Sequence, residues 1–213
     1  MSEASPVVYV VDDDASFLKA IGRLLKAKGY TVRTFASADE FLTKMVHPVG
    51  CVVADLRMPG MDGLELQEAL IRETIALPVI FLSGDGDIPH TVRAMQQGAE
   101  DFLTKAGPKE LLFHAIDRAF DRNARQRAER AHKNALRASL NSLTPRETEV
   151  LLHLVEGKLN KQIAAALGIT DRTVKLHRTA ITSKLRMRSV AELTRFAIAA
   201  ELIHEPSPTF PKG

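Results

Sequence analysis

The chain has 213 residues, of which 45% are apolar and 26% charged, and its formal net charge at pH 7 is +3. These values are ordinary for a folded protein of one large or two small domains, and no apolar run approaches the roughly 20 residues of a membrane-spanning helix. No signal peptide is visible at the N-terminus, and the single cysteine excludes a disulfide within the chain. We therefore expect a cytoplasmic protein with no membrane partner.

Short apolar runs in the first half predict strands, and helical patterns lie between them. The strands are expected at residues 7–11, 30–35, 51–55, 78–83 and 101–105. Helices are expected at residues 17–25, 64–70, 88–97 and 109–121, with a shorter one at 37–46. Strands that alternate with helices imply an α/β fold, in which a doubly wound, five-stranded parallel sheet is covered on both faces.

The second half of the chain has helical signals only. Thr144 and Glu147 form the pattern of a capping box, and Ser189 and Glu192 form another. Two helices joined by a short turn around Gly168, the second rich in basic and polar residues, are typical of a helix-turn-helix. We therefore expect a small all-α domain after the α/β domain.

Charge and composition indicate the domain boundaries. Residues 1–122 hold 13 basic and 18 acidic residues (net −5), and residues 123–213 hold 16 and 8 (net +8), which together give +3. A basic second half suits a polyanionic partner. We expect domains at 1–122 and 143–205, a helical linker at 123–142 that is more probable as a solvated helix than as a coiled-coil seam, and a disordered, proline-rich tail at 206–213.

Polar residues follow the strands at the edge of the sheet where parallel strands end. They are Asp12 and Asp13, Asp55, Ser83 and Lys105. Strands that simply end where polar residues begin would explain any one of these positions but not the set, and ligands of doubly wound sheets bind at this edge. Clustered carboxylates suit Mg²⁺, beside which Asp55 can act as a nucleophile toward phosphorus while Ser83 and Lys105 stabilise phosphoryl oxygens.

These motifs resemble a known family. The segments "VVDDD", "VVADLRMPGMDG", "IFLSG" and "DFLTK" are similar to the CheY-like receiver domain of two-component response regulators. The segment that begins "LTPRETEVLLHLVEGKLNKQIAAALG" resembles a LuxR-type helix-turn-helix. The resemblance covers residues 7 to about 200 and matches the NarL/FixJ class. It implies a transcription regulator that a partner histidine kinase phosphorylates.

The resemblance also implies roles for the residues of the first domain. Asp55 would be the phosphoacceptor, with Lys105 and Ser83 assisting. Mg²⁺ would be held directly by Asp13 and Asp55, through water by Asp12, and by the backbone carbonyl of Arg57. Ser83 and Phe102 would form the switch pair, although a Phe in a strand is usually only core. Asp14 would be solvated.

In the second domain the resemblance implies contacts with double-stranded DNA. The base-facing residues would be Lys175, Leu176 and Thr179, because the second helix of a helix-turn-helix enters the major groove. Contacts with the DNA backbone would come from Arg172, Thr173, His177, Arg178 and Lys161. The buried side of the same helix would carry Val174, Ile181 and Leu185.

One departure from the family pattern affects the loop after Lys105. The family has a proline directly after this lysine, whereas the chain reads "KAGP", with Pro108 three positions later. A cis bond before Ala106 would cost about 2.5–4 kcal/mol, so we expect a trans loop of different shape.

Three functions are therefore weighed. The first is a DNA-binding regulator, not a turnover enzyme, that Mg²⁺-dependent phosphorylation of Asp55 switches and that forms a homodimer when phosphorylated or on DNA. The second is a constitutive DNA-binding regulator whose receiver is only an interaction module. The third, an aspartate-nucleophile phosphatase, is disfavoured because Arg57 stands where such enzymes carry a second acid.

Overall fold

The computed structural model describes residues 5–45, 48–84 and 88–203. The chain forms two compact units, Met1–Ala128 and Glu129–Gly213. The expected tail at 206–213 lies outside the described residues. No helix in the described part is both long enough and apolar enough to cross a membrane.

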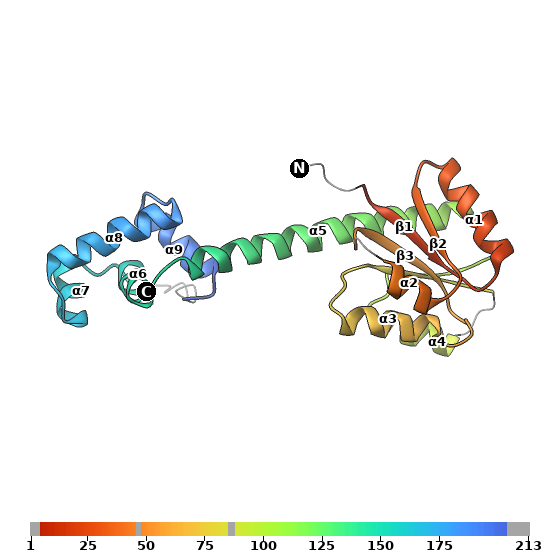
Figure 1. Ribbon diagram of the computed structural model, residues 1–213, viewed down its shortest axis with the longest axis horizontal. Coiled ribbons are helices and arrows are strands. Elements are labelled where there is room, and N and C mark those ends of the chain that lie inside the picture. Colours follow the sequence, from red (N-terminus) through yellow and green to blue (C-terminus); the bar gives the residue numbers. More distant parts are fainter. Residues whose placement is uncertain (1–4, 46–47, 85–87, 204–213) are drawn as a thin grey trace, which may run out of the picture. The chain divides into compact units, whose positions relative to one another are not determined.

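The first unit is built on a five-stranded sheet in which every pair of neighbours is parallel (Figure 1). The strands are β1 (Val7–Val11), β2 (Thr31–Phe35), β3 (Gly50–Asp55), β4 (Val79–Ser83) and β5 (Asp101–Thr104). Their order across the sheet is β2-β1-β3-β4-β5. This confirms the predicted α/β class, and the strand bounds differ from the predicted ones by one residue at most.

Helices cover both faces of this sheet. They are α1 (Ala15–Ala27), α2 (Ala38–Lys44), α3 (Gly63–Arg72), α4 (Ile88–Gln96) and α5 (Lys109–Asn141). Alternate residues of the buried strands point to opposite faces. Val8 and Val10 pack with α1 and α5, whereas Tyr9 and Val11 pack with α2 and α3. The strands read as continuous apolar runs because both faces are buried.

Helix α5 is continuous from Lys109 to Asn141, so it contains both the last helix of the first unit and the expected linker. Asn123 lies within it and is buried at 2% exposure. Its Oδ1 accepts a hydrogen bond from the Gly50 backbone N–H at 3.1 Å, and its amide nitrogen donates to the Ala76 carbonyl. The first unit runs to Ala128, past the expected boundary at residue 122, and it includes the buried Asn123.

Gly50 begins β3 in a backbone conformation that only glycine adopts easily, with φ at 128°. A Cβ atom at this position would lie 1.9 Å from the Val7 carbonyl oxygen. The start of β3 therefore packs directly on the start of β1, and Asn123 ties this junction to α5.

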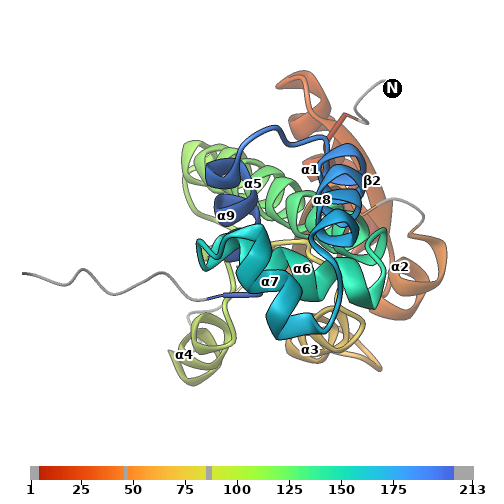
Figure 2. The same cartoon turned by 90° about the vertical axis from the view of Figure 1, so that its left-hand side faces the viewer.

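The second unit holds four further helices in the described residues, drawn in Figure 2. They are α6 (Pro145–Val155), α7 (Asn160–Leu167), α8 (Asp171–Leu185) and α9 (Val190–Ala199). Their core contains Leu151, Ile163 and Ile181, all fully buried. Leu136 and Leu140, near the end of α5, pack against the same core.

Helix capping in the second unit follows the sequence with one difference. The capping box of Thr144 and Glu147 is present. At α9, Ser189 accepts from the Glu192 backbone N–H at 3.2 Å, but the Glu192 carboxylate accepts from the Arg188 N–H instead of that of Ser189. The predicted second capping box is therefore wrong in its return bond, which reaches one residue further back.

We expect Asn123→Ala to lower the free energy of unfolding by about 1–3 kcal/mol, because it leaves the Gly50 N–H and the Ala76 carbonyl unpaired. Urea denaturation measures the loss, and amide hydrogen exchange locates it through faster exchange at Gly50. Arg125→Ala, at an exposed position of the same helix, is the control. An equal loss in both variants would show that the loss does not come from the clamp.

Candidate functional site

Three carboxylates meet at the edge of the sheet where β1 and β3 end. Asp12 and Asp13 directly follow β1, and Asp55 is the last residue of β3. One oxygen from each lies within 4.8 Å of the other two. Asp12 and Asp55 are buried, at 1% and 8% exposure, whereas Asp13 is exposed. The structure therefore brings together the three aspartates that the sequence predicts to cluster.

The Lys105 ammonium lies between two of these carboxylates. Its Nζ is 2.6 Å from Asp12 Oδ2 and 3.1 Å from Asp55 Oδ1. The same Nζ lies 4.6 Å from the centre of the Phe17 ring, so the aromatic face adds a weaker attraction. The role of Phe17 was not predicted, since its spacing fits an apolar stripe of α1 equally well.

The close packing of these groups shifts their acid–base equilibria. Burial raises the pKa of the Asp55 carboxyl, the charge of Asp12 raises it as well, and the hydrogen bond from Lys105 only partly offsets these effects. For Lys105, burial lowers the pKa of the ammonium, but hydrogen bonds to Asp12 and Asp55 outweigh it and raise the pKa. Lys105 therefore remains a cation, whereas burial and the nearby charge of Asp12 disfavour the ionised form of Asp55.

The three consecutive aspartates differ in what they bind. Asp12 Oδ1 accepts a hydrogen bond from the Asp14 N–H at 2.9 Å. The Asp14 carboxylate accepts from the N–H groups of Ser16 and Phe17, and so caps the N-terminus of α1. Asp14 is exposed, as predicted, but its capping role was not predicted. Of the three consecutive aspartates, Asp12 and Asp13 belong to the carboxylate cluster and Asp14 does not.

Gly63 fixes the loop that follows Asp55. Its N–H donates to the Leu56 carbonyl at 3.0 Å, and a Cβ atom at this position would lie 2.4 Å from the Asp55 carbonyl oxygen. Any larger residue would displace the backbone of Asp55. The sequence marks a turn at Pro59 and Gly60, but nothing in it distinguishes Gly63 from an ordinary turn glycine.

Ser83 lies at the end of β4 and is buried at 5% exposure. Its carbonyl accepts from the Lys105 N–H at 2.8 Å, which joins it to the cluster through the backbone. Phe102 is half-buried, and its ring centre lies 6.2 Å from that of Phe81. Arg57 is exposed two residues after Asp55. The residues predicted to assist Asp55 thus lie on the strands and loops around it.

The loop after Lys105 turns without a cis peptide bond, and the described residues contain none. The Gly107 N–H donates to the Thr104 carbonyl at 2.9 Å. A Cβ atom at Gly107 would lie 2.9 Å from Thr104 Oγ1, so this tight turn depends on glycine. The sequence "KAGP" therefore forms a compact turn in which Gly107, rather than a proline, sets the path of the chain.

The carboxylate cluster is suited to a divalent cation. Mg²⁺ prefers oxygen ligands at about 2.0–2.1 Å, so ligand atoms on opposite sides of the ion are about 4.2 Å apart. The three aspartate oxygens lie within 4.8 Å of one another, so small side-chain rotations bring them into this range. The Lys105 ammonium already holds a positive charge beside Asp12 and Asp55. The donor set therefore fits a hard cation.

In the second unit, α7 and α8 form a helix-turn-helix. Gly168 ends α7 in the left-handed conformation, at φ 65°, and Thr170 caps the start of α8 two residues later. Val174, Ile181 and Leu185 of α8 are buried, which confirms the predicted core face.

The other face of α8 carries the residues predicted to read DNA. Lys175, Leu176 and Thr179 are all exposed, and Leu176 is 65% exposed. An apolar side chain this exposed in the middle of a helix buries little within its own unit, and it suits contact with a thymine methyl group in the major groove.

The residues predicted to contact the DNA backbone differ in how freely they can do so. Arg172 and Lys161 are exposed, and Thr173 and His177 are half-buried. The Thr173 N–H donates to Thr170 Oγ1 and so belongs to the cap of α8. Arg178 donates to Asn160 Oδ1 at 2.7 Å, which links α8 to α7.

Helix α8 is also fixed to α6 by an ion pair. Glu147 is buried at 5% exposure, and its Oε2 lies 2.6 Å from the Lys184 Nζ. The hydrogen bond from Lys184 lowers the pKa of the Glu147 carboxyl, and the Thr144 N–H contributes as well. The sequence predicts Glu147 as a capping residue but not as the anchor of the recognition helix.

Comparison with known proteins agrees with this architecture. Residues 8–117 match the family described as response regulator receiver domain, and residues 141–197 match the family described as bacterial regulatory proteins, luxR family. A receiver followed by such a helix-turn-helix defines a class of response regulator.

Several known proteins are similar to this one over nearly the whole chain. The response regulator protein TmoT of Ectopseudomonas mendocina is 40% identical over 92% of this chain and 89% of its own length. The transcriptional regulatory protein FixJ of Bradyrhizobium diazoefficiens is 35% identical over 93% of this chain and 97% of its own. The solved structure of response regulator StyR is 44% identical, covers 91% of this chain and 98% of its own, and has a TM-score of 0.86. The chain belongs to the response regulators of the NarL/FixJ class, which act in two-component systems.

We expect Asp55→Asn to raise the free energy of unfolding at pH 7, in EDTA, by about 1 kcal/mol or more, because it removes a buried charge and leaves Lys105 paired with Asp12. The folded-state pKa of Asp55 is raised, so its ionised form costs stability above the ordinary pKa of 3.8. The gain should therefore disappear as the pH falls through that value. Urea denaturation across this range measures it.

Asp121→Asn, at an exposed position of α5, is the control and should change stability little at any pH. A loss of stability in Asp55→Asn at pH 7 would show that the pairing with Lys105 outweighs the repulsion and burial.

Proposed function

We propose that the protein is a transcription regulator whose DNA binding is switched by phosphorylation of Asp55 from a partner histidine kinase, in a reaction that needs Mg²⁺. The observation that carries this proposal is the position of Lys105, whose ammonium lies within 3.1 Å of both Asp12 and Asp55. Lys105 supplies one positive charge, whereas Asp12, Asp13 and Asp55 supply three negative charges. The site therefore has room for a further cation.

In this proposal Asp13 and Asp55 would hold the metal directly, Asp12 would hold it through water, and the Arg57 backbone carbonyl would be a further ligand. When bound, Mg²⁺ supplies positive charge that offsets the negative charge of the transferring phosphoryl group. The exposed side of the site agrees with this, since Asp13 is accessible while Asp12 and Asp55 form its buried floor.

The chemical step is a phosphoryl transfer to Asp55. A carboxylate oxygen of Asp55 forms the new O–P bond as the N–P bond of the kinase phosphohistidine breaks. The histidine imidazole of the kinase is the leaving group. Lys105 stays protonated and pairs with a phosphoryl oxygen, and the Ser83 hydroxyl donates to another. The raised pKa of Lys105 supports its role as a permanent cation.

The signal is the change in charge at one buried point. A phosphoryl group adds about −1.5 to −2 charge, which biases a two-state surface around Ser83 and Phe102. Phe102 is suited to this role because it is half-buried and packs against the core beside Phe81. We propose that the altered surface favours a homodimer, on phosphorylation or on paired DNA half-sites.

The remaining assignments follow from this role. The receiver promotes its own phosphorylation and dephosphorylation but does not turn over a separate substrate. The partners are the sensor kinase and double-stranded DNA, without a membrane, and the place of action is the cytoplasm. In the second unit, α8 enters the major groove with Lys175, Leu176 and Thr179 toward the bases.

We expect the intact protein to gain the mass of one phosphoryl group when incubated with Mg²⁺ and acetyl phosphate, measured by mass spectrometry. The gain should be lost with EDTA, because the acid cluster then lacks its cation, and in Asp55→Ala, because the nucleophile is missing. Asp121→Ala, which removes an exposed acid of α5 that is not part of the cluster, should still be phosphorylated.

The same samples distinguish a regulator that phosphorylation switches from one that binds DNA constitutively. In a gel shift, phosphorylated wild type should bind DNA more tightly than unphosphorylated wild type, while Asp55→Ala should be insensitive to the phosphodonor. Equal binding in all four samples would favour a constitutive DNA-binding regulator whose receiver is an interaction module, and would direct attention to the "KAGP" turn.

For DNA recognition we expect different effects from two lysines. Lys175→Ala should reduce discrimination between a selected site and its single-base variants by about 1–3 kcal/mol at the position read. Lys161→Ala should weaken binding to all sequences alike and lower the salt dependence by about one unit of slope. Fluorescence anisotropy with DNA selected from a random pool, at several salt concentrations, distinguishes them. Equal discrimination in Lys175→Ala would mean that this residue does not read bases.

A further inference from the structure

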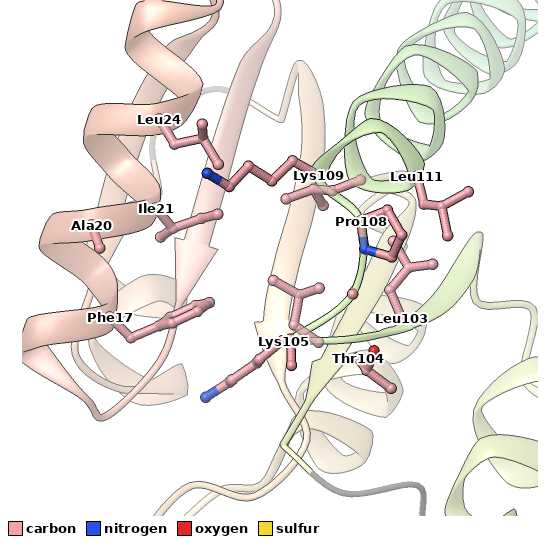
Figure 3. Close-up of a pocket in the computed structure, with 14 residues that line it drawn as sticks. Phe17, Ala20, Ile21, Leu24, Leu103, Thr104, Lys105, Pro108, Lys109 and Leu111 are labelled. Atoms are coloured by element: carbon pink, nitrogen blue, oxygen red, sulfur yellow. The ribbon is translucent and has the colours of Figure 1, made fainter.

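A cavity of about 350 Å³ lies in the first unit between α1 and the turn that joins β5 to α5 (Figure 3). We call it the α1 cavity. Its size lies within the range of small-molecule sites in proteins, about 300–1,000 Å³. It opens beside the carboxylate cluster, since Lys105 lines it, but none of the three clustered aspartates belongs to its wall.

The walls of the α1 cavity are mostly apolar. Phe17, Ala20 and Leu24 contribute one wall from α1, and Leu103, Pro108 and Leu111 contribute the opposite wall. Figure 3 shows these two sets facing each other across the cavity. Leu111, which lines the cavity, is a large apolar residue and is nevertheless 51% exposed.

The charge at the α1 cavity has one sign. Lys105 and Lys109 line it, and no Asp or Glu does. Lys105 is already paired with Asp12 and Asp55. Lys109 is different, because no described residue forms an ion pair with it, and Figure 3 shows its side chain reaching from α5 toward Leu24. Lys109 is also the first residue of α5, where the helix dipole adds positive potential.

We propose that the α1 cavity binds a small monocarboxylate with a flat apolar body, whose carboxylate pairs with Lys109 while the body lies between α1 and the β5–α5 turn. The apolar walls exclude a strongly hydrated anion such as free phosphate, which has no apolar part to bury. The absence of acids from the lining excludes a cationic ligand. The binding itself does not depend on phosphorylation of Asp55.

The turn with the sequence "KAGP", which lacks the proline that the family has directly after its lysine, shapes this cavity. Ala106, Gly107 and Pro108 all line it. Gly107 makes the close contact with Thr104. Lys105 also connects the cavity to the acid cluster, because its stem lines the cavity while its ammonium reaches Asp12.

The test uses 2-naphthoate as the probe, titrated with the full-length protein and followed by the probe's fluorescence. The chain has no tryptophan, so the protein contributes little emission of its own. We expect saturable binding of one equivalent. The neutral analogue 2-naphthalenemethanol should bind about five- to tenfold more weakly, the size of one charge-assisted hydrogen bond at a partly exposed site.

Two variants locate the site. Ala20→Phe, at an exposed position of α1 that lines the cavity, should fill it and weaken binding at least tenfold. Lys109→Gln should weaken naphthoate about five- to tenfold and leave the neutral analogue unchanged. Lys19→Gln, an exposed lysine of α1 that does not line the cavity, is the matched control and should bind within twofold of wild type.

Several results would overturn the proposal. They are no saturable binding of 2-naphthoate, equal affinity for the neutral analogue, unchanged binding in a folded Ala20→Phe variant, or an equal loss in Lys19→Gln and Lys109→Gln. Circular dichroism confirms that each variant is folded. If Ala20→Phe does not fold, the comparison of Lys109→Gln with Lys19→Gln decides alone.

Discussion

The pairing of one lysine with two buried carboxylates is the interaction on which the chemistry of the first unit depends. Parallel strands bring their carboxyl ends to one edge, and here that edge gathers like charges where water is partly excluded. Lys105 offsets two of them, at 2.6 and 3.1 Å, and Asp13 stays in solvent. One cation beside three acids leaves a net negative charge, and burial keeps the pKa of Asp55 raised even with Lys105 beside it. Such a site is suited to binding an added cation.

This charge balance is maintained by backbone contacts that tolerate little change. A Cβ atom at Gly63 would lie 2.4 Å from the Asp55 carbonyl, and one at Gly107 would lie 2.9 Å from Thr104 Oγ1. The first contact sets where Asp55 ends its strand, and the second sets the direction of the chain after Lys105. The backbone around the acid and its cation thus includes two tight turns, in which a Cβ atom has no room at Gly63 and little room at Gly107.

Patterns repeated along the chain could be predicted from the sequence, and single long-range contacts could not. The five strands and the edge with Asp12, Asp55 and Lys105 follow from apolar runs that end in polar residues, because that period reflects burial directly. Asn123 and Glu147 were missed or only partly understood. Each is a lone polar residue in a helix, and its partners, Gly50 and Lys184, are distant in sequence. No local pattern distinguishes such a residue from a solvated one.

The continuity of α5 limits how such a protein can be recombined. Asn123 completes the core of the receiver, while Leu136 and Leu140, further along the same helix, complete the core of the DNA-binding unit. A hybrid regulator that joins this receiver to another output domain must therefore be spliced between residues 124 and 135. A junction before Asn123 would remove the clamp on Gly50. A junction after Leu136 would remove from the new output domain the helix residues that pack against its core. A single helix thus contributes to the cores of both units, and the exchangeable receiver module is longer than the boundary at residue 122 suggests.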